Sequence, residues 1–317
     1  MKPVSVVIPA LGDVPLLRRA MKSLLLEFEL RDVGDELVVV DDTGTGALER
    51  ERAALIGERE GVRLITREVN GGFAEALTTG IEAARHDLVF SMNSDVVVRT
   101  GFLAPLSRAL ADDVFAVAPA ALLGGDAETV ESYNRARLAN GLLDVRSSPG
   151  PAPTEGCHPV AFAVGGTMLF DRRRFAELGG FDPLFEPFYF EDVDLCWRAW
   201  RAGLRTLFCA DAIVEHHHKG TIGRYLSEGR RRAAVERGEL LFNWKHLAED
   251  DLAEHLALLY RRTLDGYLTD RRDDLVWLSL ALAKLDEVTD RRKGARERST
   301  RDVLALEDGP GLDADRG

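Results

Sequence analysis

Residues 87–96 read DLVFSMNSDV, and this stretch decides the fold. Leu88–Met92 is a short, mainly apolar run of the kind that forms a buried parallel strand, and it passes directly into the polar residues Asn93-Ser94-Asp95. Earlier segments have the same strand character, and they are Val4–Ile8, Glu36–Val40 and Val62–Thr66. The sequence therefore predicts four strands before residue 93.

Helical patterns fill the intervals between these strands. They are the stripe of Leu17, Met21, Leu24 and Phe28, and the helix-like segments Ala47–Glu60 and Phe73–Arg85. The alternation of strand and helix predicts an α/β fold with a mostly parallel central sheet, right-handed crossovers and flanking helices. Ligands on such sheets bind beyond the carboxyl ends of the strands. The polar residues at those ends are Asp41, Asp42, Asn70 and Asp95.

The composition excludes several classes of protein. The 317 residues carry a net charge of −12, which argues against general nucleic-acid binding because that function needs a basic face. The three cysteines form no C-x-x-C pair, so we expect neither a disulfide framework nor a four-cysteine zinc site. The N-terminus lacks a signal-peptide core, and no apolar run approaches the roughly 18 residues of a membrane span. We therefore expect a cytoplasmic protein.

Changes in residue pattern divide the chain into three predicted regions. Residues 1–224 form the catalytic region, with a nucleotide-binding half over 1–98 and an acceptor-side half over 99–224. Residues 225–290 form a C-terminal helical appendage. Residues 291–317 are charged and Gly-rich, and we expect them to be disordered.

The acceptor-side half is less regular than the first. Residues 124–160 contain Gly124-Gly125 and the closely spaced prolines Pro149, Pro151 and Pro153, and we interpret them as a mobile loop or excursion. Arg205–Phe208 and Ala212–Val214 predict two short strands, which lead into Glu215-His216-His217-His218.

Two acidic sites follow predicted strands. The carboxylates of Asp41 and Asp42 are suited to accept hydrogen bonds from a nucleotide base or from ribose hydroxyls, and an N-cap for the next helix explains them equally well. Asp95 can bind a hard divalent cation such as Mg²⁺ or Mn²⁺ that bridges a diphosphate, and the alternative is an Asx-type turn. Because both sites occupy equivalent ends of one predicted sheet, the pattern favours ligand binding over an N-cap and an Asx-type turn that arise independently.

A third acidic cluster, Glu191-Asp192-Val193-Asp194, begins a predicted helix. Acidic residues at a helix N-terminus are favoured by the helix dipole, by about 0.3–1 kcal/mol each, and this alone can account for them. The functional alternative is that one of them is a general base. The preceding aromatic residues, Phe185, Phe188, Tyr189 and Phe190, would then raise its pKa by excluding water.

His216 is a candidate metal ligand in the histidine triplet, although such a triplet is also often a polar loop.

The residues after the first strand argue against other kinds of nucleotide site. A dinucleotide-binding Rossmann site is excluded because Pro9-Ala10-Leu11-Gly12-Asp13 stands where that site has G-x-G-x-x-G. No G-x-x-x-x-G-K-[ST] motif occurs. A nucleotidyltransferase would want a basic, Gly-rich loop at this strand end, and residues 9–13 contain no Lys or Arg.

The predicted C-terminal helices allow two interpretations. Arg230–Arg232 precede an apolar stretch with Trp244, so a helix here could lie on an anionic membrane surface. The alternative is a helix packed on the catalytic region or in a homodimer interface. Residues 219–300 carry 17 Lys and Arg against 15 Asp and Glu, a weak basic excess that favours packing over membrane contact.

Taken in order, several segments resemble the family 2 glycosyltransferases with the GT-A fold, especially their rhamnosyltransferase-like bacterial members. The matching segments are VSVVIPALGD (4–13), ELVVVDD (36–42), NGGFAEALTTG (70–80), DLVFSMNSDV (87–96), VGGTMLFDRRRFAELGGFDPLF (164–185), EDVDLCWRAWRAG (191–203) and HHHKGT (216–221). The likeness covers roughly residues 1–225 and keeps the order of the family. A D-x-D metal motif is usual there, and this chain departs from it with Asn93 in place of the first acid.

The resemblance implies roles for individual residues. Asp192 would be the base, with Glu191 beside it, and Asp95 and His216 would bind Mn²⁺ or Mg²⁺. The nucleotide and donor sugar would be bound by Pro9, Ala10, Asp41, Asp42, Gly71, Asn93, Asp95, Gly165 and Gly166. The acceptor side would include Phe181, Asp182 and Trp197.

The resemblance also implies an activity. It is transfer of a sugar, with inversion, from dTDP-rhamnose or a UDP-hexose to a glycan or lipid-linked acceptor in cell-surface polysaccharide synthesis. Such an enzyme would be cytoplasmic, with peripheral contact to the inner face of the membrane. The alternative is a catalytically inactive sugar-nucleotide-binding or scaffold protein on the same fold.

Overall fold

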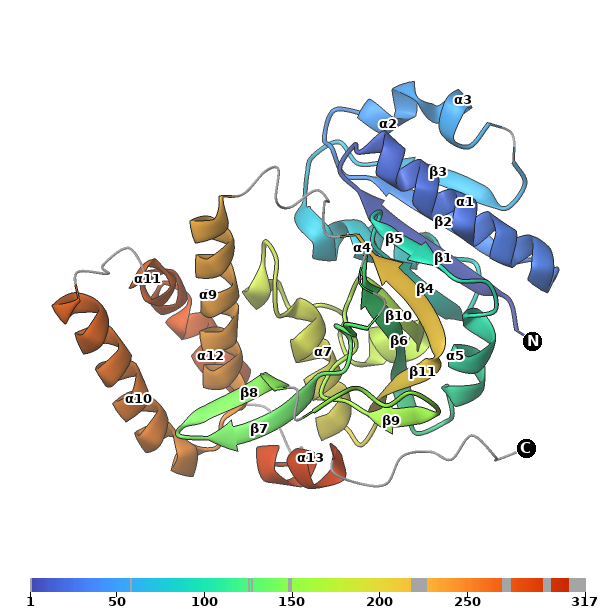
Figure 1. Ribbon diagram of the computed structural model, residues 1–317. Coiled ribbons are helices and arrows are strands. Elements are labelled where there is room, and N and C mark those ends of the chain that lie inside the picture. The colour runs from blue at the N-terminus through green and yellow to red at the C-terminus, as the bar shows by residue number, and fades with distance from the viewer. Residues whose placement is uncertain are drawn as a thin grey trace.

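The computed structural model describes residues 2–57, 59–124, 126, 128–147, 150–217, 227–269, 275–292 and 298–307. Within these ranges the strands form a nine-stranded sheet of order β3-β2-β1-β4-β10-β6-β11-β5, with β9 paired to β11 (Figure 1). Its strands are β1 (Val4–Ala10), β2 (Glu36–Asp41), β3 (Val62–Thr66), β4 (Leu88–Met92), β5 (Val96–Val98), β6 (Val114–Leu123), β9 (Cys157–Pro159), β10 (Thr167–Asp171) and β11 (Arg205–His216).

The first half of the sheet is the parallel unit that the sequence predicts. Strands β3, β2, β1 and β4 pair in parallel. The apolar residues of β2 and β4 are all buried because both faces of the sheet are covered there, whereas Leu64 and Ile65 of the edge strand β3 are partly exposed. The connecting helices are α1 (Val14–Arg31), α2 (Ala47–Arg50), α3 (Arg52–Leu55) and α4 (Gly72–Ala83). The helix predicted over 47–60 is shorter and divided, since the backbone of Glu51 leaves helical geometry at φ −97° and ψ 4°.

The second half mixes strand directions. Strand β10 runs antiparallel to both β4 and β6, and β6 runs parallel to β11. The two short strands predicted at 205–208 and 212–214 are one strand, β11, which is interrupted by a bulge between Cys209 and Ile213. Its end at His216 lies beside β5 and therefore beside the turn that contains Asp95.

The prediction of a loop over 124–160 is wrong for many of its described residues, which form strands. They include the hairpin of β7 (Arg135–Ala139) and β8 (Leu142–Ser147), in addition to β9. The turn between β7 and β8 is Asn140-Gly141, with φ values of 55° and 73°, which is the positive-φ turn that hairpins favour. Leu143 of β8 is fully buried, so the hairpin belongs to the core.

The helices of the second half are α5 (Leu103–Ala109), α6 (Arg172–Glu177), the short 3₁₀ helix η1 (Pro183–Phe185) and α7 (Glu191–Arg201). The C-terminal helices are α9 (Glu228–His246), α10 (Glu249–Leu268), α11 (Val276–Leu282), α12 (Leu285–Arg292) and α13 (Thr300–Glu307). Figure 1 shows α9 to α12 grouped on one side of the molecule, with α7 between them and the sheet. Leu241 and Phe242 of α9 are fully buried in the same core as α7, so this helix packs on the catalytic region.

The predicted disorder of the tail is wrong for residues 300–307. They form α13, in which Val303 is fully buried and the Thr300 hydroxyl donates to the His246 carbonyl at 2.7 Å. Residues 293–297 and 308–317 lie outside the described part of the chain. Among the described helices, none has both the length and the apolar character needed to cross a bilayer.

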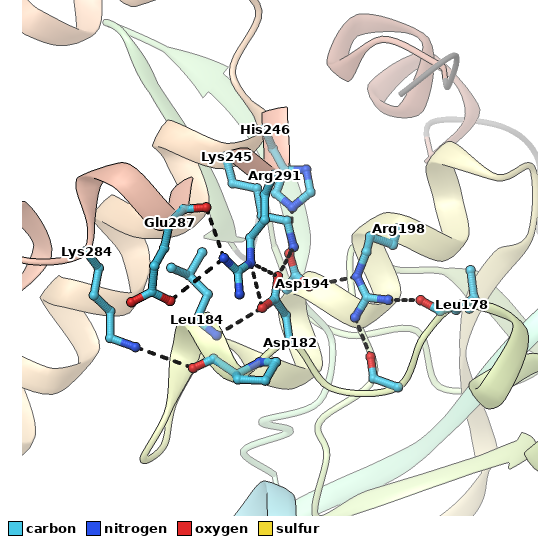
Figure 2. A network of polar contacts seen from close by, with 12 residues as sticks. Leu178, Asp182, Leu184, Asp194, Arg198, Lys245, His246, Lys284, Glu287 and Arg291 are labelled. Atoms are coloured by element: carbon cyan, nitrogen blue, oxygen red, sulfur yellow. Dashed lines mark hydrogen bonds and ion pairs between the residues drawn. The ribbon is translucent and has the colours of Figure 1, made fainter. Parts of the chain in front are cut away.

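A buried ionic network joins α7 to the C-terminal helices (Figure 2). The fully buried carboxylate of Asp194 contacts Arg198 at 2.8 Å, Lys245 at 2.6 Å and His246 at 2.8 Å. Burial alone would raise the pKa of Asp194, but the charges of Arg198 and Lys245 hold it well below its usual range. Burial lowers the pKa of His246 to about 4, so this imidazole is neutral near pH 7.

We predict that acid destabilises the protein through this network. At acidic pH the unfolded chain binds more protons than the folded state, because both folded pKa values are lower than the unfolded values of about 6.5 for His and about 3.9 for Asp. The free energy of unfolding should therefore fall as pH drops from about 6.5 towards 4, and fall further below 4. Urea unfolding at a series of pH values measures this.

Asp194→Asn should lower the free energy of unfolding at pH 7 by about 3–5 kcal/mol, because it leaves buried cations without their carboxylate. The matched control is Asp250→Asn, an exposed acid at the start of α10, which should change stability by about 1 kcal/mol or less. Equal effects of the two substitutions would contradict the importance of the network.

Candidate functional site

Pro9 and Ala10 end β1, and they pair with Val40 and Asp41 at the end of β2. The carboxylate of Asp41 is fully buried and accepts from Thr43 N at 3.0 Å, Thr43 Oγ1 at 2.6 Å and Leu48 N at 2.8 Å. The Asp41 carboxylate therefore satisfies an N–H in the first turn of α2, although the N-cap residue of this helix is Gly46.

The Asp42 carboxylate braces the turn that precedes α4. It accepts from the backbone N–H groups of Gly71 and Gly72, both at 3.0 Å, and it pairs with Arg67 at 2.9 Å. Burial raises the pKa of Asp42 above its ordinary value. Five of the predicted nucleotide-binding residues thus lie at one corner of the sheet, namely Pro9, Ala10, Asp41, Asp42 and Gly71. The carboxylates of Asp41 and Asp42, however, already accept hydrogen bonds from within the protein.

The dipeptide Gly165-Gly166 joins two distant parts of the predicted site. The Gly165 N–H donates to Asp192 Oδ2 at 2.7 Å, and the Gly166 carbonyl accepts from Asn93 N at 2.9 Å. A Cβ at Gly165 would lie 3.1 Å from the Asp192 Cβ, and one at Gly166 would lie 2.3 Å from the Asn93 Cγ. Asn93 and Asp192 therefore pack on neighbouring residues of a single chain segment.

Asp192 lies in the first turn of α7, directly after a strained backbone. Tyr189 and Phe190 have φ values of 74° and 78°, which is uncommon for residues with bulky side chains. The second oxygen of Asp192 accepts from the N–H of Val193 at 2.8 Å. Burial raises the pKa of Asp192, even though these backbone donors favour its charged form. A carboxylate of this kind is suited to accept a proton near neutral pH.

Glu191 faces a different side from Asp192. It lines a cavity of about 310 Å³ between α4 and the segment 181–188, and Asp192 is not part of that lining. Glu191 is 6% exposed, and its Oε2 has no hydrogen-bond partner in the described part of the chain. Burial, together with the nearby charge of Asp192, raises the pKa of Glu191 to about 8. Glu191 is therefore mostly protonated at neutral pH.

Asp95 and His216 come together where β5 pairs with β11. The Nε2 atom of His216 lies 3.3 Å from Asp95 Oδ1, and its Nδ1 atom lies 3.4 Å from Glu131 Oε2. Burial alone would lower the pKa of His216, but the two carboxylates outweigh it and raise the pKa above its ordinary value. His216, Glu131 and Asn93 also line a cavity of about 180 Å³, together with Gly166 and Thr167.

The donor set of this cluster fits Mn²⁺ or Mg²⁺. Asp95 offers an oxygen and His216 an imidazole nitrogen on the same side of the ring, and such metals often use one or two protein ligands in addition to substrate phosphates. Within the described residues, no group of three or more His, Cys, Asp and Glu side chains is placed to hold a metal. His218 lies outside the described residues.

The acceptor-side prediction for Trp197 is wrong. Its side chain is fully buried and packs edge-to-face on Phe242 of α9, with ring centroids 5.7 Å apart, so it offers no surface to a substrate. Phe181 and Asp182 do line the 310 Å³ cavity. However, the Asp182 carboxylate also accepts from Lys245 and Arg291, each at 2.8 Å, which ties it to the network of Figure 2.

Sequence reasoning missed two residues of α9 that hold the strained turn. Arg237 is 7% exposed and donates to the carbonyls of Phe185 at 2.7 Å and Glu186 at 2.8 Å. Gly238 lets the helix approach the turn, because a Cβ there would lie 2.7 Å from the Phe190 ring. A glycine inside a helical pattern is the sequence signal for such a close approach.

The family model for glycosyl transferase family 2 matches residues 5–179, which is more than half of the chain. The chain belongs to this family. A curated relative, the pre-mycofactocin glycosyltransferase of Mycobacterium tuberculosis, is 28% identical over 219 residues. That alignment covers 68% of this chain but 43% of the relative, so the chain spans less than half of that protein.

Solved structures show the same fold. The structure of GalNAc-T7 with UDP, GalNAc and Mn²⁺ superposes with a TM-score of 0.62 at 21% identity, and covers 78% of this chain and 49% of that one. The mannosyltransferase PcManGT from Pyrobaculum calidifontis, in complex with GDP-Man and Mn²⁺, gives 0.55 at 17% identity and covers 96% and 79%. The predicted GT-A fold is confirmed.

We predict that Gly166→Ala disrupts the site. The added Cβ would overlap the Asn93 side chain, so the turn at residues 93–95 must move and the protein should lose about 1–3 kcal/mol of stability. Thermal unfolding measures the change. Gly229→Ala is the matched control, because nothing lies within 4 Å of its Cβ position in α9 and alanine there should stabilise the helix slightly. Equal melting temperatures for the two variants would contradict the close contact.

Proposed function

We propose that this family 2 chain is an inverting glycosyltransferase that moves a sugar from a nucleoside-diphosphate sugar to an acceptor hydroxyl. The observation that carries the proposal is the Gly165-Gly166 junction, where Gly165 contacts the Asp192 carboxylate and Gly166 contacts Asn93 at the start of the Asn93-Ser94-Asp95 turn. A base and a phosphate-binding turn on one chain segment are what a single in-line displacement needs.

Asp192 is the base in this mechanism. Its raised pKa favours taking the proton from the acceptor hydroxyl, and the Gly165 N–H keeps Oδ2 in a fixed position while it does so. The hydroxyl oxygen then attacks the anomeric carbon from the face opposite the leaving diphosphate, and a single displacement inverts that carbon. Asp95 and His216 would hold Mn²⁺ or Mg²⁺, which supplies charge neutralisation for the diphosphate when bound.

The donor and acceptor are proposed from chemistry and relatives. The presence of UDP or GDP-mannose together with Mn²⁺ in the superposed structures supports a nucleoside-diphosphate sugar and a divalent cation. The sequence likeness favours dTDP-rhamnose or a UDP-hexose. Phe181 and Asp182, in the wall of the cavity along α4, are the proposed acceptor-side residues, and a glycan or lipid-linked molecule is the proposed acceptor. Because Asp192 does not line this cavity, only a part of the acceptor away from the reacting hydroxyl would bind there. Cytoplasmic location, peripheral membrane contact and a homodimer remain predictions.

We predict that Asp192→Asn lowers the rate of sugar transfer by about 10²–10⁴-fold, because the amide cannot accept the proton. Binding of the cognate sugar nucleotide should be unchanged, since Asn can still accept from the Gly165 N–H. Transfer is measured with dTDP-rhamnose and UDP-hexoses against glycan and polyprenyl-linked acceptors, and donor binding is measured by thermal shift. At 100 times Kd the donor should stabilise both proteins by about 2.7 kcal/mol.

Asp87→Asn, an exposed acid before β4, is the matched control and should transfer like the wild type. Loss of donor binding in Asp192→Asn to the same extent as loss of transfer would argue against the base assignment. Strong donor binding with no transfer by the wild type to any acceptor would favour the alternative, an inactive sugar-nucleotide-binding protein.

We also predict that chelation by EDTA stops transfer, and that Mn²⁺ or Mg²⁺ restores it, because the departing diphosphate then lacks a counter-charge. Asp95→Asn should not recover at the metal concentration that restores the wild type. Full activity in EDTA would remove the metal from the mechanism while leaving the base assignment intact.

A further inference from the structure

We propose that Glu131 is the positioning residue that fixes the metal-binding face of His216. The inference rests on the proposed metal role of Asp95 and His216. Glu131 lies in a segment that resembles no catalytic motif, yet its carboxylate is 3.4 Å from His216 Nδ1, while Nε2 of the same ring is 3.3 Å from Asp95. The two carboxylates therefore contact different nitrogens of one imidazole.

The Asp95 side of this arrangement is set by strand pairing. His216 is opposite Val96 in the antiparallel pair of β11 and β5, and Asp95 immediately precedes Val96. The His217 N–H also donates to the Asp95 carbonyl at 3.0 Å. These backbone contacts hold Asp95 and His216 next to each other without any help from their side chains.

The Glu131 side is set by a second backbone contact, to β6. The Glu131 N–H donates to the Ala121 carbonyl at 2.9 Å, and the buried Ser132 hydroxyl donates to the Pro119 carbonyl at 2.6 Å and accepts from the Ala121 N–H at 2.9 Å. Strand β6 is the parallel neighbour of β11, with Leu123 opposite His216. Glu131 is thus fixed to the strand that lies beside the one carrying His216.

This geometry matches what a metal-binding histidine requires. A neutral imidazole binds a cation through one nitrogen and donates the N–H of the other, usually to a carboxylate or carbonyl that fixes the tautomer and the ring orientation. With Glu131 accepting from Nδ1–H, the lone pair of Nε2 points to the side where Asp95 offers its oxygen. Because Glu131 faces the other nitrogen, it acts through His216 and is not itself a ligand.

The test measures binding of Mn²⁺ alone to the full chain, by loss of the electron paramagnetic resonance signal of free Mn²⁺. Glu131→Gln keeps the size of the side chain but weakens the acceptor, and it should lower Mn²⁺ affinity by about 10–100-fold. Glu128→Gln is the matched control, because Glu128 is an exposed acid on the same segment, and it should bind like the wild type. Asp95→Asn should lose binding more completely than Glu131→Gln.

A second measurement needs no metal. Because Asp95 also accepts from Nε2–H when no metal is bound, the spectra are recorded in an Asp95→Ala background at a pH where the ring is neutral. Long-range ¹H–¹⁵N spectra of the His216 ring, assigned with His216→Gln, should show the Nδ1–H form with Glu131 present and a shift towards the Nε2–H form in Glu131→Gln. A change in general stability would not alter this tautomer ratio, so the spectra separate positioning from folding.

Wild-type affinity in Glu131→Gln, or an unchanged tautomer ratio, would overturn the proposal. Loss of Mn²⁺ as complete as in Asp95→Asn would also overturn it, by making Glu131 a direct ligand. If the wild type binds no Mn²⁺, the proposal fails together with the metal role, whereas donor binding by thermal shift still tests the transferase function on its own.

Discussion

The absence of side chains at Gly165 and Gly166 is the constraint on which the site depends. Strand β10 runs antiparallel to β4, so the segment entering β10 must pass the turn that leaves β4. A Cβ at either position would push against Asn93 on one side or Asp192 on the other. Glycine at both positions lets the Asn93-Ser94-Asp95 turn and the start of α7 approach the same backbone closely, and the constraint is stricter at Gly166, where the Cβ would lie 2.3 Å from the Asn93 side chain. The sheet topology therefore brings the Asn93-Ser94-Asp95 turn and the start of α7 to the same segment, and the two glycines allow both to pack closely against it.

The C-terminal helices contribute to this site although they carry no catalytic residue in the proposed mechanism. Tyr189 and Phe190 occupy a backbone region that costs about 1–3 kcal/mol per residue, so surrounding structure must hold them there. Arg237 does this by donating to the carbonyls of the preceding loop, and Gly238 provides the space. Helix α9 therefore supports the turn that precedes Asp192, the proposed base.

The sequence predicted those parts of the molecule whose patterns are local. Strands β1 to β4 and their helices follow from apolar runs and helical spacing. The contact between Asp95 and His216 agrees with the pair of metal ligands that the resemblance implies. The acceptor-side prediction for Trp197 conflicts with a local pattern in the sequence itself. Val193, Cys196, Trp197 and Trp200 recur at i, i+3, i+4 and i+7, which places this tryptophan on the buried face of α7. The Asn140-Gly141 pair likewise predicts a hairpin turn, but the prolines that follow it favoured the interpretation as a loop.

Other parts could not be predicted because they depend on contacts between distant segments. No local pattern shows that Asp42 braces the turn at Gly71, or that Glu131 lies beside His216. The first turn of α7 is the clearest example. Asp192 and Asp194 are both aspartates in the same turn, and no local pattern separates them, yet their pKa values are shifted in opposite directions. Asp194 is surrounded by Arg198, Lys245 and His246, and its pKa is held low, which makes it an anchor. Among the described residues, the hydrogen bonds to the Asp192 carboxylate come from backbone N–H groups, and burial raises its pKa. The cations Arg198 and Lys245 thus distinguish the structural carboxylate of Asp194 from Asp192, the proposed base.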